Sequence, residues 1–324
     1  MSEIRQNILT GEWTIYASNR FGKPYDFKKH PTREAVERKC PFCPGNEHMT
    51  PEPVYSDGED GNWTIRVFPN LYPALSCENA KDNDDLFYTS VCGIGHHEVV
   101  VDTPDHTKNI HDLTAEEINK VLLVIRERYA DMRKRNGVKY VQVFKNSGPE
   151  AGASINHSHW QIIGGSLGGL QQDLERINCD GYFDKNGSCL MCDMIKHEKT
   201  ENKRVVAENE RFIVFVPFAS KAAFELYIVP KEHINGYENM DDEHIKDLAY
   251  ILKPILDKVQ KLFKGLSYNI CFQDIVEGDR KETRHWYARI LPRIGTYAGY
   301  EFGTGTFINP IIPEFAADKY NDME

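Results

Sequence analysis

Two stretches of the chain repeat one order of apolar and polar positions. Each opens with an apolar run of strand length, at residues 96–101 and 223–229, and continues through a proline turn into an amphipathic helix. The first helix is expected to begin after Thr114, because Glu117 stands three residues on and completes a capping box. The second is expected to begin near Asp241. Apolar positions at helical spacing predict a buried stripe on each helix, formed by Ile118, Val121, Leu122, Ile125 and Tyr129 in the first and by Ile245, Leu248, Leu252, Ile255, Leu256 and Val259 in the second.

A strand follows each predicted helix, at 139–148 and 267–274, and leads through a polar loop to a strand that carries histidine, at 155–163 and 284–292. An internal repeat of this kind indicates two similar structural units. We therefore predict an α+β protein of two tandem halves, each an antiparallel sheet with packed helices. The predicted halves are residues 1–170 and 171–324, joined around residues 164–187.

Composition places the chain among ordinary soluble proteins. Of 324 residues, 40% are hydrophobic and 27% charged, and no run of about 18 apolar residues predicts a transmembrane helix. The opening residues MSEIRQNILTGEW lack the apolar core of a signal peptide. A formal net charge of −10 argues against a nucleic-acid binder that relies on phosphate neutralisation. We expect a cytoplasmic protein with no nucleic-acid and no membrane partner.

The segment INHSHWQII, at residues 155–163, concentrates polar groups at alternate positions. In an extended segment alternate side chains face the same way, so His157, His159 and Gln161 would share one face and Trp160 and Ile162 the other. Taken alone, the pattern fits either a solvated strand edge or a functional site.

The cysteines decide part of that question. Without an export signal, the eight cysteines are expected as metal ligands or buried apolar groups, not as disulfides. Two Cys-x-x-Cys pairs each precede two histidines, and these histidines lie 51 residues apart in the first half and 52 in the second. Tetrahedral zinc takes such Cys₂His₂ sets. We predict two zinc sites per chain, formed by Cys40, Cys43, His106 and His157 and by Cys189, Cys192, His233 and His285.

Alternatives remain open at the second set. Cys189 and Cys192 would also suit a buried turn, and His285 could pack beside Trp286 as an aromatic neighbour. The sequence does not distinguish zinc from iron at either site.

The two halves differ where catalysis would sit. If His157 binds metal, His159 stays free on the same face, whereas the matching position in the second half is Tyr287. Gln161 is likewise matched by Arg289. A neutral imidazole can attack phosphorus and carry a phosphoryl or nucleotidyl group, and Gln161 could donate its amide to a phosphate oxygen as charge develops. The preceding loop, residues 146–156, is rich in small residues that let backbone N–H groups approach phosphate.

These residues match a known family. The segments KCPFCPGNE, TPDHTKNIHDLT, FKNSGPEAGASINHSHWQ and GYEFGTGTFINPIIPEFAA resemble the galactose-1-phosphate uridylyltransferase family of the histidine-triad superfamily, over nearly the whole chain. The resemblance implies two histidine-triad-like halves and a homodimer. It also implies a ping-pong transfer of a nucleoside monophosphate from a nucleotide sugar to a hexose 1-phosphate through a covalent histidine intermediate.

Carried over by position, the resemblance makes His159 the nucleophile and Gln161 the phosphate-contacting glutamine. It makes the first Cys/His set the family's zinc ligands. The remaining positions that match substrate contacts are Arg20 and Lys23 for phosphate, Asn70 for the nucleoside, Asn146 and Ser154 for the nucleotide phosphates, and Tyr300 and Glu301 for the hexose.

The chain departs from the classical uridylyltransferases at several of these positions. Leu71 stands where they have aspartate, and Lys23 stands where they have a second arginine, so a point charge replaces a bidentate fork. A lysine that reaches the sugar phosphate is replaced near Gly295, and a metal-binding His-x-His becomes Tyr287 and Arg289. The second Cys/His set is similar to that of plant relatives described as ADP-glucose phosphorylases. Base, sugar, acceptor and oligomer interface therefore stay undetermined.

Three other functions remain possible on these residues. An ADP-glucose-type phosphorylase would use inorganic phosphate as acceptor, a hydrolase of dinucleotide polyphosphates would use water, and a zinc-stapled binding module would carry out no transfer. The asymmetry between His159 and Tyr287 argues against the binding module. His96, His97, His111 and His244 belong to none of these constellations, and we expect them to be solvated or to cap helices.

Overall fold

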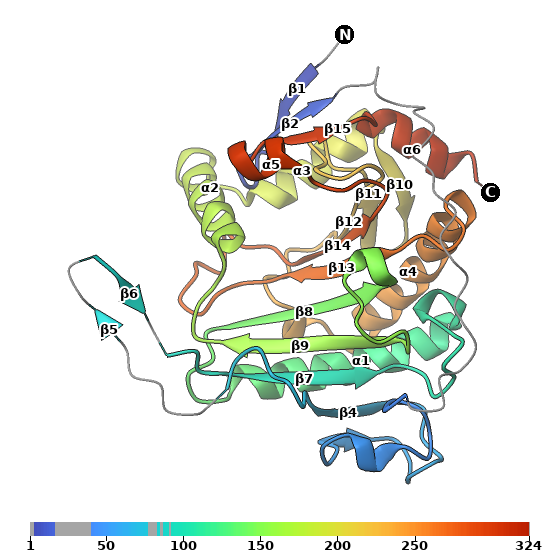
Figure 1. The fold of residues 1–324 in the computed structure, drawn as a ribbon. Helices are drawn as coiled ribbons and strands as arrows, with labels where there is room; N and C mark the ends of the chain where they lie inside the picture. Colours follow the sequence, from blue (N-terminus) through green and yellow to red (C-terminus); the bar gives the residue numbers. More distant parts are fainter. Residues whose placement is uncertain (1–2, 17–39, 77–82, 85–86, 91, 324) are drawn as a thin grey trace.

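The fold is built on one long antiparallel sheet. The computed structural model describes residues 3–16, 40–76, 83–84, 87–90 and 92–323. In this part of the chain ten strands pair in the order β10-β11-β12-β14-β13-β8-β9-β7-β4-β3 (Figure 1). The strands of the first half are β3 (Tyr55–Ser56), β4 (Arg66–Pro69), β7 (Gly95–Val101), β8 (Tyr140–Ser147) and β9 (His159–Gly165). Those of the second half are β10 (Val205–Glu208), β11 (Phe212–Phe215), β12 (Leu226–Pro230), β13 (Tyr268–Gln273) and β14 (Tyr287–Pro292).

The two predicted sheets are continuous. The central strands β8 and β13 pair antiparallel, with Asn146 opposite Asn269. On either side of this pair the strand order of one half mirrors that of the other, as a duplicated unit with a local two-fold axis requires. The predicted α+β class with two similar antiparallel halves is confirmed, and the pairing of β8 with β13 joins the halves through backbone hydrogen bonds.

One face of the sheet is covered by the two predicted helices, α1 (Ala115–Arg133) and α4 (Asp242–Leu262), which contact each other (Figure 1). The capping box forms as predicted, because Thr114 accepts from the Glu117 N–H while the Glu117 carboxylate accepts from the Thr114 N–H. In α4 the Asp241 side chain accepts from the His244 N–H. The apolar stripes of both helices are buried in one core that also contains Trp160 and Ile162.

The opposite face of the sheet carries the polar residues of interest. Strand β7 pairs with β9 so that Val99 lies opposite Gln161 and Val101 opposite His159. Because side chains alternate along a strand, His159 and Gln161 point away from the face that holds Trp160. The predicted division of the INHSHWQII segment into two faces is therefore confirmed from His159 onward, although β9 begins at His159 and His157 precedes it.

Smaller elements surround the sheet. Residues 164–187, expected to join the halves, mostly form a helix, α2, which is followed by α3. A three-stranded sheet brings the first strands of the chain beside β15, which pairs parallel with β2. The remaining elements are β1 (Glu3–Gln6), β2 (Trp13–Tyr16), β5 (Asn83–Asp84), β6 (Thr89–Ser90), β15 (Phe307–Asn309), α2 (Leu170–Asn186), α3 (Leu190–Glu201), α5 (Gly299–Thr304), α6 (Pro313–Asn321) and the short 3₁₀ helices η2 (Glu47–Met49), η3 (Ile110–Asp112), η4 (Pro149–Ala151) and η5 (Tyr237–Asn239). The boundary at residue 170 stays a prediction.

Among the described residues, no helix has both the length and the apolar character needed to cross a bilayer.

Candidate active site and metal centres

The first Cys/His set converges on one point. The ligand atoms of Cys40, Cys43, His106 and His157 all lie within 4.8 Å of one another. His157 Nδ1 is 3.7 Å from Cys40 Sγ and 3.6 Å from Cys43 Sγ, and His106 Nδ1 is 3.4 Å from Cys43 Sγ. Tetrahedral zinc with Zn–S of about 2.3 Å and Zn–N of about 2.0 Å places each sulfur about 3.6 Å from each nitrogen. The four residues therefore have the geometry of a closed metal shell.

Local structure fixes two of these ligands. The Cys43 N–H donates to the Cys40 carbonyl in a tight turn, and the Asn46 side chain donates to the same carbonyl. His157 Nε2 lies 2.7 Å from the Thr103 carbonyl. A carbonyl only accepts, so Nε2 carries the proton and Nδ1 is left for the metal.

The second set repeats this arrangement around β12 and β14. The ligand atoms of Cys189, Cys192, His233 and His285 also lie within 4.8 Å of one another. His285 Nε2 donates to the Pro230 carbonyl at 3.0 Å, as His157 does to Thr103, and its Nδ1 is 3.5 Å from Cys192 Sγ. The alternative that this set is only a buried turn does not account for four convergent ligand atoms. Both sets could hold a metal ion.

His159 is held in one tautomer. Its Nδ1 lies 2.8 Å from the His157 carbonyl and must donate to it, so in the neutral ring Nε2 carries a lone pair. Burial lowers the pKa of His159 to about 4, with only part of that effect opposed by the His157 hydrogen bond. No partner for Nε2 is found among the residues that the structure describes. The Phe42 ring edge packs against the imidazole, with the ring centroids 5.2 Å apart.

A buried charge pair supports the segment between metal ligand and imidazole. Lys145 Nζ is 2.7 Å from Asp102 Oδ2, 2.7 Å from Ser158 Oγ and 3.1 Å from the His159 carbonyl oxygen. Both charged side chains are completely buried. Because ammonium only donates, the Ser158 hydroxyl accepts from Lys145 and donates its own hydrogen bond to Asn109 Oδ1 at 3.2 Å. A single sequence does not reveal this network, since nothing in it pairs positions 102, 145 and 158.

Gln161 is held by His97, and this corrects an expectation. His97 is not a solvated or capping histidine, because it is buried with its Nε2 2.9 Å from Gln161 Oε1 and 3.2 Å from Asn70 Nδ2. The alternation of strand 95–101 puts His97 on the same face as Val99, which lies opposite Gln161. That signal was present in the sequence, but it becomes informative only when the register of β7 against β9 is known.

The loop between β8 and β9 has the shape expected of a phosphate cradle. Gly148 and Gly152 have φ of +87° and +85°, a region that favours glycine. A Cβ on Gly148 would lie 2.2 Å from Ser267 Oγ, so no larger residue fits there. Asn146 Oδ1 accepts from Asn269 at 2.8 Å, which turns its Nδ2 toward the loop, and Ser154 is exposed. These two predicted phosphate contacts therefore border the loop that precedes His159.

The other predicted substrate contacts that the structure describes lie in different parts of the molecule. Asn70 follows β4, accepts from the Tyr72 N–H and lies beside His97, on the His159 side of the sheet. Arg20 and Lys23 lie outside the described residues. Tyr300 and Glu301 are on α5, which packs against β15 (Figure 1). Glu301 lines a cavity of about 90 Å³ whose described lining comes wholly from the second half.

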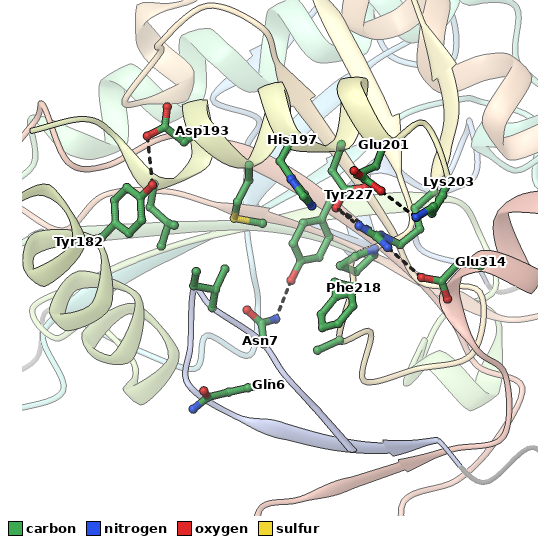
Figure 2. Close-up of a pocket in the computed structure, with 17 residues that line it drawn as sticks. Gln6, Asn7, Tyr182, Asp193, His197, Glu201, Lys203, Phe218, Tyr227 and Glu314 are labelled. Carbon is green, nitrogen blue, oxygen red and sulfur yellow. Dashed lines mark hydrogen bonds and ion pairs between the residues drawn. The ribbon is translucent and has the colours of Figure 1, made fainter. Parts of the chain in front are cut away.

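A larger cavity of about 700 Å³ lies elsewhere, between α3 and the residues that follow β1. Figure 2 shows Asn7 and Gln6 on one side, His197 and Glu201 on α3 on the other, and Tyr227 between them. None of the predicted site residues that the structure describes lines it. Its size alone does not make it the site of chemistry.

The second half fills the positions that match the site. The Tyr287 hydroxyl, in place of His159, donates to Glu175 at 2.8 Å, and Arg289, in place of Gln161, is paired with Glu225 at 2.6 Å. All four side chains are buried. The metal-type set is thus common to both halves, whereas of the two matching positions only His159 presents an imidazole nitrogen without a partner among the described residues.

Comparison with known proteins agrees with this geometry. The family descriptions "Galactose-1-phosphate uridyl transferase, N-terminal domain" and "C-terminal domain" match residues 1–167 and 175–294. The chain belongs to the galactose-1-phosphate uridyl transferase family. It is thus an enzyme of the hexose-1-phosphate nucleotidyltransferase type, as the sequence predicted.

Members of this uridyl transferase family and its plant relatives align along the whole chain. An ADP-glucose phosphorylase of Arabidopsis thaliana is 32% identical over 99% of this chain and 93% of its own. A galactose-1-phosphate uridylyltransferase of Thermotoga maritima is 28% identical over 100% and 99%. A crystal structure of the Arabidopsis ADP-glucose phosphorylase with bound ADP-glucose superposes with a TM-score of 0.85 at 29% identity, covering 100% of both chains. A solved uridylyltransferase gives 0.78 at 26% identity, covering 99% and 98%.

Proposed function

We propose that the protein transfers a nucleoside monophosphate from a nucleoside diphosphate sugar to a hexose 1-phosphate, with His159 as the covalent carrier. The observation that carries the proposal is the His159 imidazole, which donates through Nδ1 to the His157 carbonyl and leaves Nε2 with a lone pair beside a glycine-containing loop. Because burial lowers its pKa to about 4, the imidazole is neutral at pH 7 and able to attack.

The first step forms one bond and breaks one. The Nε2 lone pair attacks the α-phosphorus, the bond from that phosphorus to the bridging oxygen breaks, and hexose 1-phosphate leaves with the electron pair. The proton stays on Nδ1 and remains hydrogen-bonded to the His157 carbonyl, which stabilises the positive charge that develops on the nucleotidylated ring. Gln161 and the N–H groups of the loop are proposed to donate to the non-bridging oxygens.

The second step reverses the first with a new acceptor. A phosphate oxygen of the acceptor attacks the same phosphorus, the P–N bond breaks, and Nε2 regains its lone pair. That oxygen is already ionised at pH 7, so the step needs no general base. The proposed contacts to phosphate are Asn146, Ser154, Arg20 and Lys23, and the proposed nucleoside contact is Asn70.

Zinc is the metal that the two Cys/His sets fit best, since thiolate and imidazole ligands at tetrahedral separations suit it. Each set offers four protein ligands, so a bound ion would have no open position for substrate. Its contribution in the first half would be to anchor His157, and through that residue the carbonyl that orients His159.

A second acceptor is favoured by a specific observation. The Arabidopsis relative named ADP-glucose phosphorylase is more similar in sequence and in structure than the uridylyltransferases compared above, and Leu71 replaces an aspartate of the classical enzymes. Inorganic phosphate acting on an ADP-glucose-derived intermediate is therefore the alternative reaction.

One experiment separates these possibilities. The protein is incubated with UDP-glucose or ADP-glucose, quenched in alkali to preserve a phosphoramidate, and examined by intact-mass spectrometry. The expected adduct is one nucleotide per chain, absent from His159→Asn and retained by the exposed-residue control His48→Asn. Discharge by galactose 1-phosphate supports the transferase, discharge by phosphate the phosphorylase, and discharge by water alone a hydrolase. An adduct on His159→Asn, or none on wild type with either donor, would sink the proposal.

We also propose a cytoplasmic homodimer in which two copies share each site. Tyr300 and Glu301 lie among residues of the second half, on a helix whose Phe302 is 80% exposed. We propose that a hexose contact at His159 comes from a second copy of the chain. Light scattering should give twice the chain mass. Co-expression of His159→Asn with a Tyr300→Ala, Glu301→Ala chain should recover roughly a quarter of the activity, because half the dimers carry one intact site. A monomer, or no recovery, would contradict the arrangement.

A further inference from the structure

We infer that His97 is a positioning residue that sets which end of the Gln161 amide faces the substrate. The inference rests on the proposed function of Gln161 as a phosphate donor. It assigns a role to a histidine two positions before Val99 on β7, away from both metal-type sets.

A backbone donor fixes the tautomer of His97. The Ala74 N–H lies 3.3 Å from His97 Nδ1, and a peptide nitrogen in this position can only donate. Nδ1 must therefore accept, and the single proton of the neutral ring is on Nε2. Burial lowers the pKa of His97, which keeps the ring neutral.

The proton on Nε2 then decides the orientation of Gln161. At 2.9 Å from Nε2, the amide end of Gln161 must be its acceptor, Oε1. The NH₂ end is turned the other way and has two hydrogens for a phosphate oxygen. If the amide were reversed, its carbonyl oxygen would meet the phosphate oxygens and repel them, because both carry partial negative charge.

Asn70 lies beside the same nitrogen but is oriented by the Tyr72 N–H. Its Oδ1 accepts from the Tyr72 N–H, so its Nδ2 is the end that lies 3.2 Å from His97 Nε2. Nε2 carries a proton and cannot accept from Asn70. One imidazole thus separates two amide donors, one assigned to the nucleoside and one to the phosphate.

The second half contains the same device with the opposite polarity. The Lys221 N–H donates to Glu225 Oε2 at 2.8 Å, and Glu225 Oε1 accepts from Arg289 Nε at 3.0 Å and Nη2 at 2.6 Å. Tyr227 lies opposite Arg289 as Val99 lies opposite Gln161, so Glu225 and Arg289 occupy the positions of His97 and Gln161.

The two halves therefore share one relay. In the first half the Ala74 N–H donates to His97, which contacts Gln161. In the second half the Lys221 N–H donates to Glu225, which contacts Arg289. The Glu225 carboxylate can only accept, so it binds the Arg289 guanidinium. An imidazole protonated on Nε2 presents a donor and so leaves an amide with its N–H groups outward. The difference between His97 and Glu225 thus accompanies the difference between His159 and Tyr287 at the neighbouring position of each half.

Two neutral amide substitutions test the inference. Gln at position 97 can place an N–H near the position of Nε2, whereas Asn is shorter and keeps only a group near Nδ1. The rate of adduct formation is measured in single turnover with UDP-glucose or ADP-glucose. His97→Asn should lower this rate about 10- to 100-fold, while the donor concentration that gives half the maximal rate changes less than about 3-fold. The rate of His97→Gln should stay within about 5-fold of wild type.

The decisive comparison is a double-mutant cycle with Gln161→Ala. Because His97 acts through Gln161, the His97→Asn, Gln161→Ala protein should be no slower than Gln161→Ala alone. If the two losses multiply, or if His97→Asn and His97→Gln react alike, the inference is overturned. His97→Leu replaces His97→Asn in the same cycle if the asparagine variant does not fold. A wild-type protein that forms no adduct sinks the proposed function itself, whereas multiplying losses in an active protein sink only the role of His97.

Discussion

We predict that breaking the buried Lys145–Asp102 pair will lower both the free energy of unfolding and the rate of adduct formation at His159. Replacing Lys145 by methionine keeps most of the apolar stem but removes the ammonium, and leaves the Asp102 carboxylate buried without this cation. Both side chains have zero exposure and are 2.7 Å apart. Breaking a buried pair on one side costs about 3–5 kcal/mol of unfolding free energy, because the remaining charge is desolvated and uncompensated.

The lost contacts to Ser158 and to the His159 carbonyl belong to the same perturbation, so their energies are not added to this figure. The matched control is Lys145→Met with Asp102→Asn, which removes the unpaired charge with little change in shape. That double variant should recover most of the loss and remain within about 1–2 kcal/mol of wild type.

Equilibrium unfolding in urea measures both proteins. Trp160 is a suitable fluorophore, since it is fully buried and its ring centroid lies 5.6 Å from Lys145 Nζ. The single variant should also form the His159 adduct about 10- to 100-fold more slowly, because the backbone of residues 157–159 loses a support and the imidazole is displaced. A loss under about 1 kcal/mol in the single variant, or no recovery in the double variant, would refute the reasoning.

Three other outcomes are expected. Cys43→Ala and Cys192→Ala should each lower the metal content by one equivalent and lower the Tm, but only Cys43→Ala should abolish adduct formation. Inductively coupled plasma mass spectrometry measures the metal, and the adduct assay measures the reaction. An active Cys43→Ala protein would contradict the anchoring role of the first set. Burial raises the pKa of Asp274 to about 7, so between about pH 4 and 7 the folded state keeps a proton that the unfolded state has lost. The free energy of unfolding is therefore highest below about pH 4 and falls by up to about 4 kcal/mol as the pH rises to 7. Asp274→Asn should flatten that part of the pH profile in urea unfolding, and parallel profiles would argue against the shift. Thr114→Ala should cost about 1 kcal/mol by opening the capping box of α1, measured in the same assay, and an unchanged midpoint would mean that the cap contributes nothing.

Features set by local spacing were predictable from the sequence. The Thr114 cap, the apolar stripes of α1 and α4 and the opposite faces of Trp160 and His159 each depend on a few consecutive residues, and the structure contains them. The repeat made it possible to compare two Cys-Cys-His-His sets whose first and last members lie 117 residues apart in one half and 96 in the other. The family match added an expected role for each site residue.

Features set by the pairing of distant strands were not predictable in this way. The sequence alone does not assign His97 to the site, because the register of β7 on β9 is needed to see that it reaches Gln161. The Lys145–Asp102 pair depends on three strands at once. The pairing of β8 with β13 could not be foreseen either, since each half alone satisfies the repeat without it.

The pairing of β8 with β13 is also consistent with an origin of the chain by duplication of one unit. Cut between its halves, the sheet would expose β8 and β13 as edge strands, each with a row of unsatisfied backbone groups. Because the two strands occupy matching places in a duplicated unit, an ancestral single-unit protein could have met a second molecule of itself along that edge. Gene fusion would then have turned an interface between two molecules into an internal seam. Once the seam was covalent, one copy of the site was free to lose its histidine to tyrosine while the other kept the chemistry.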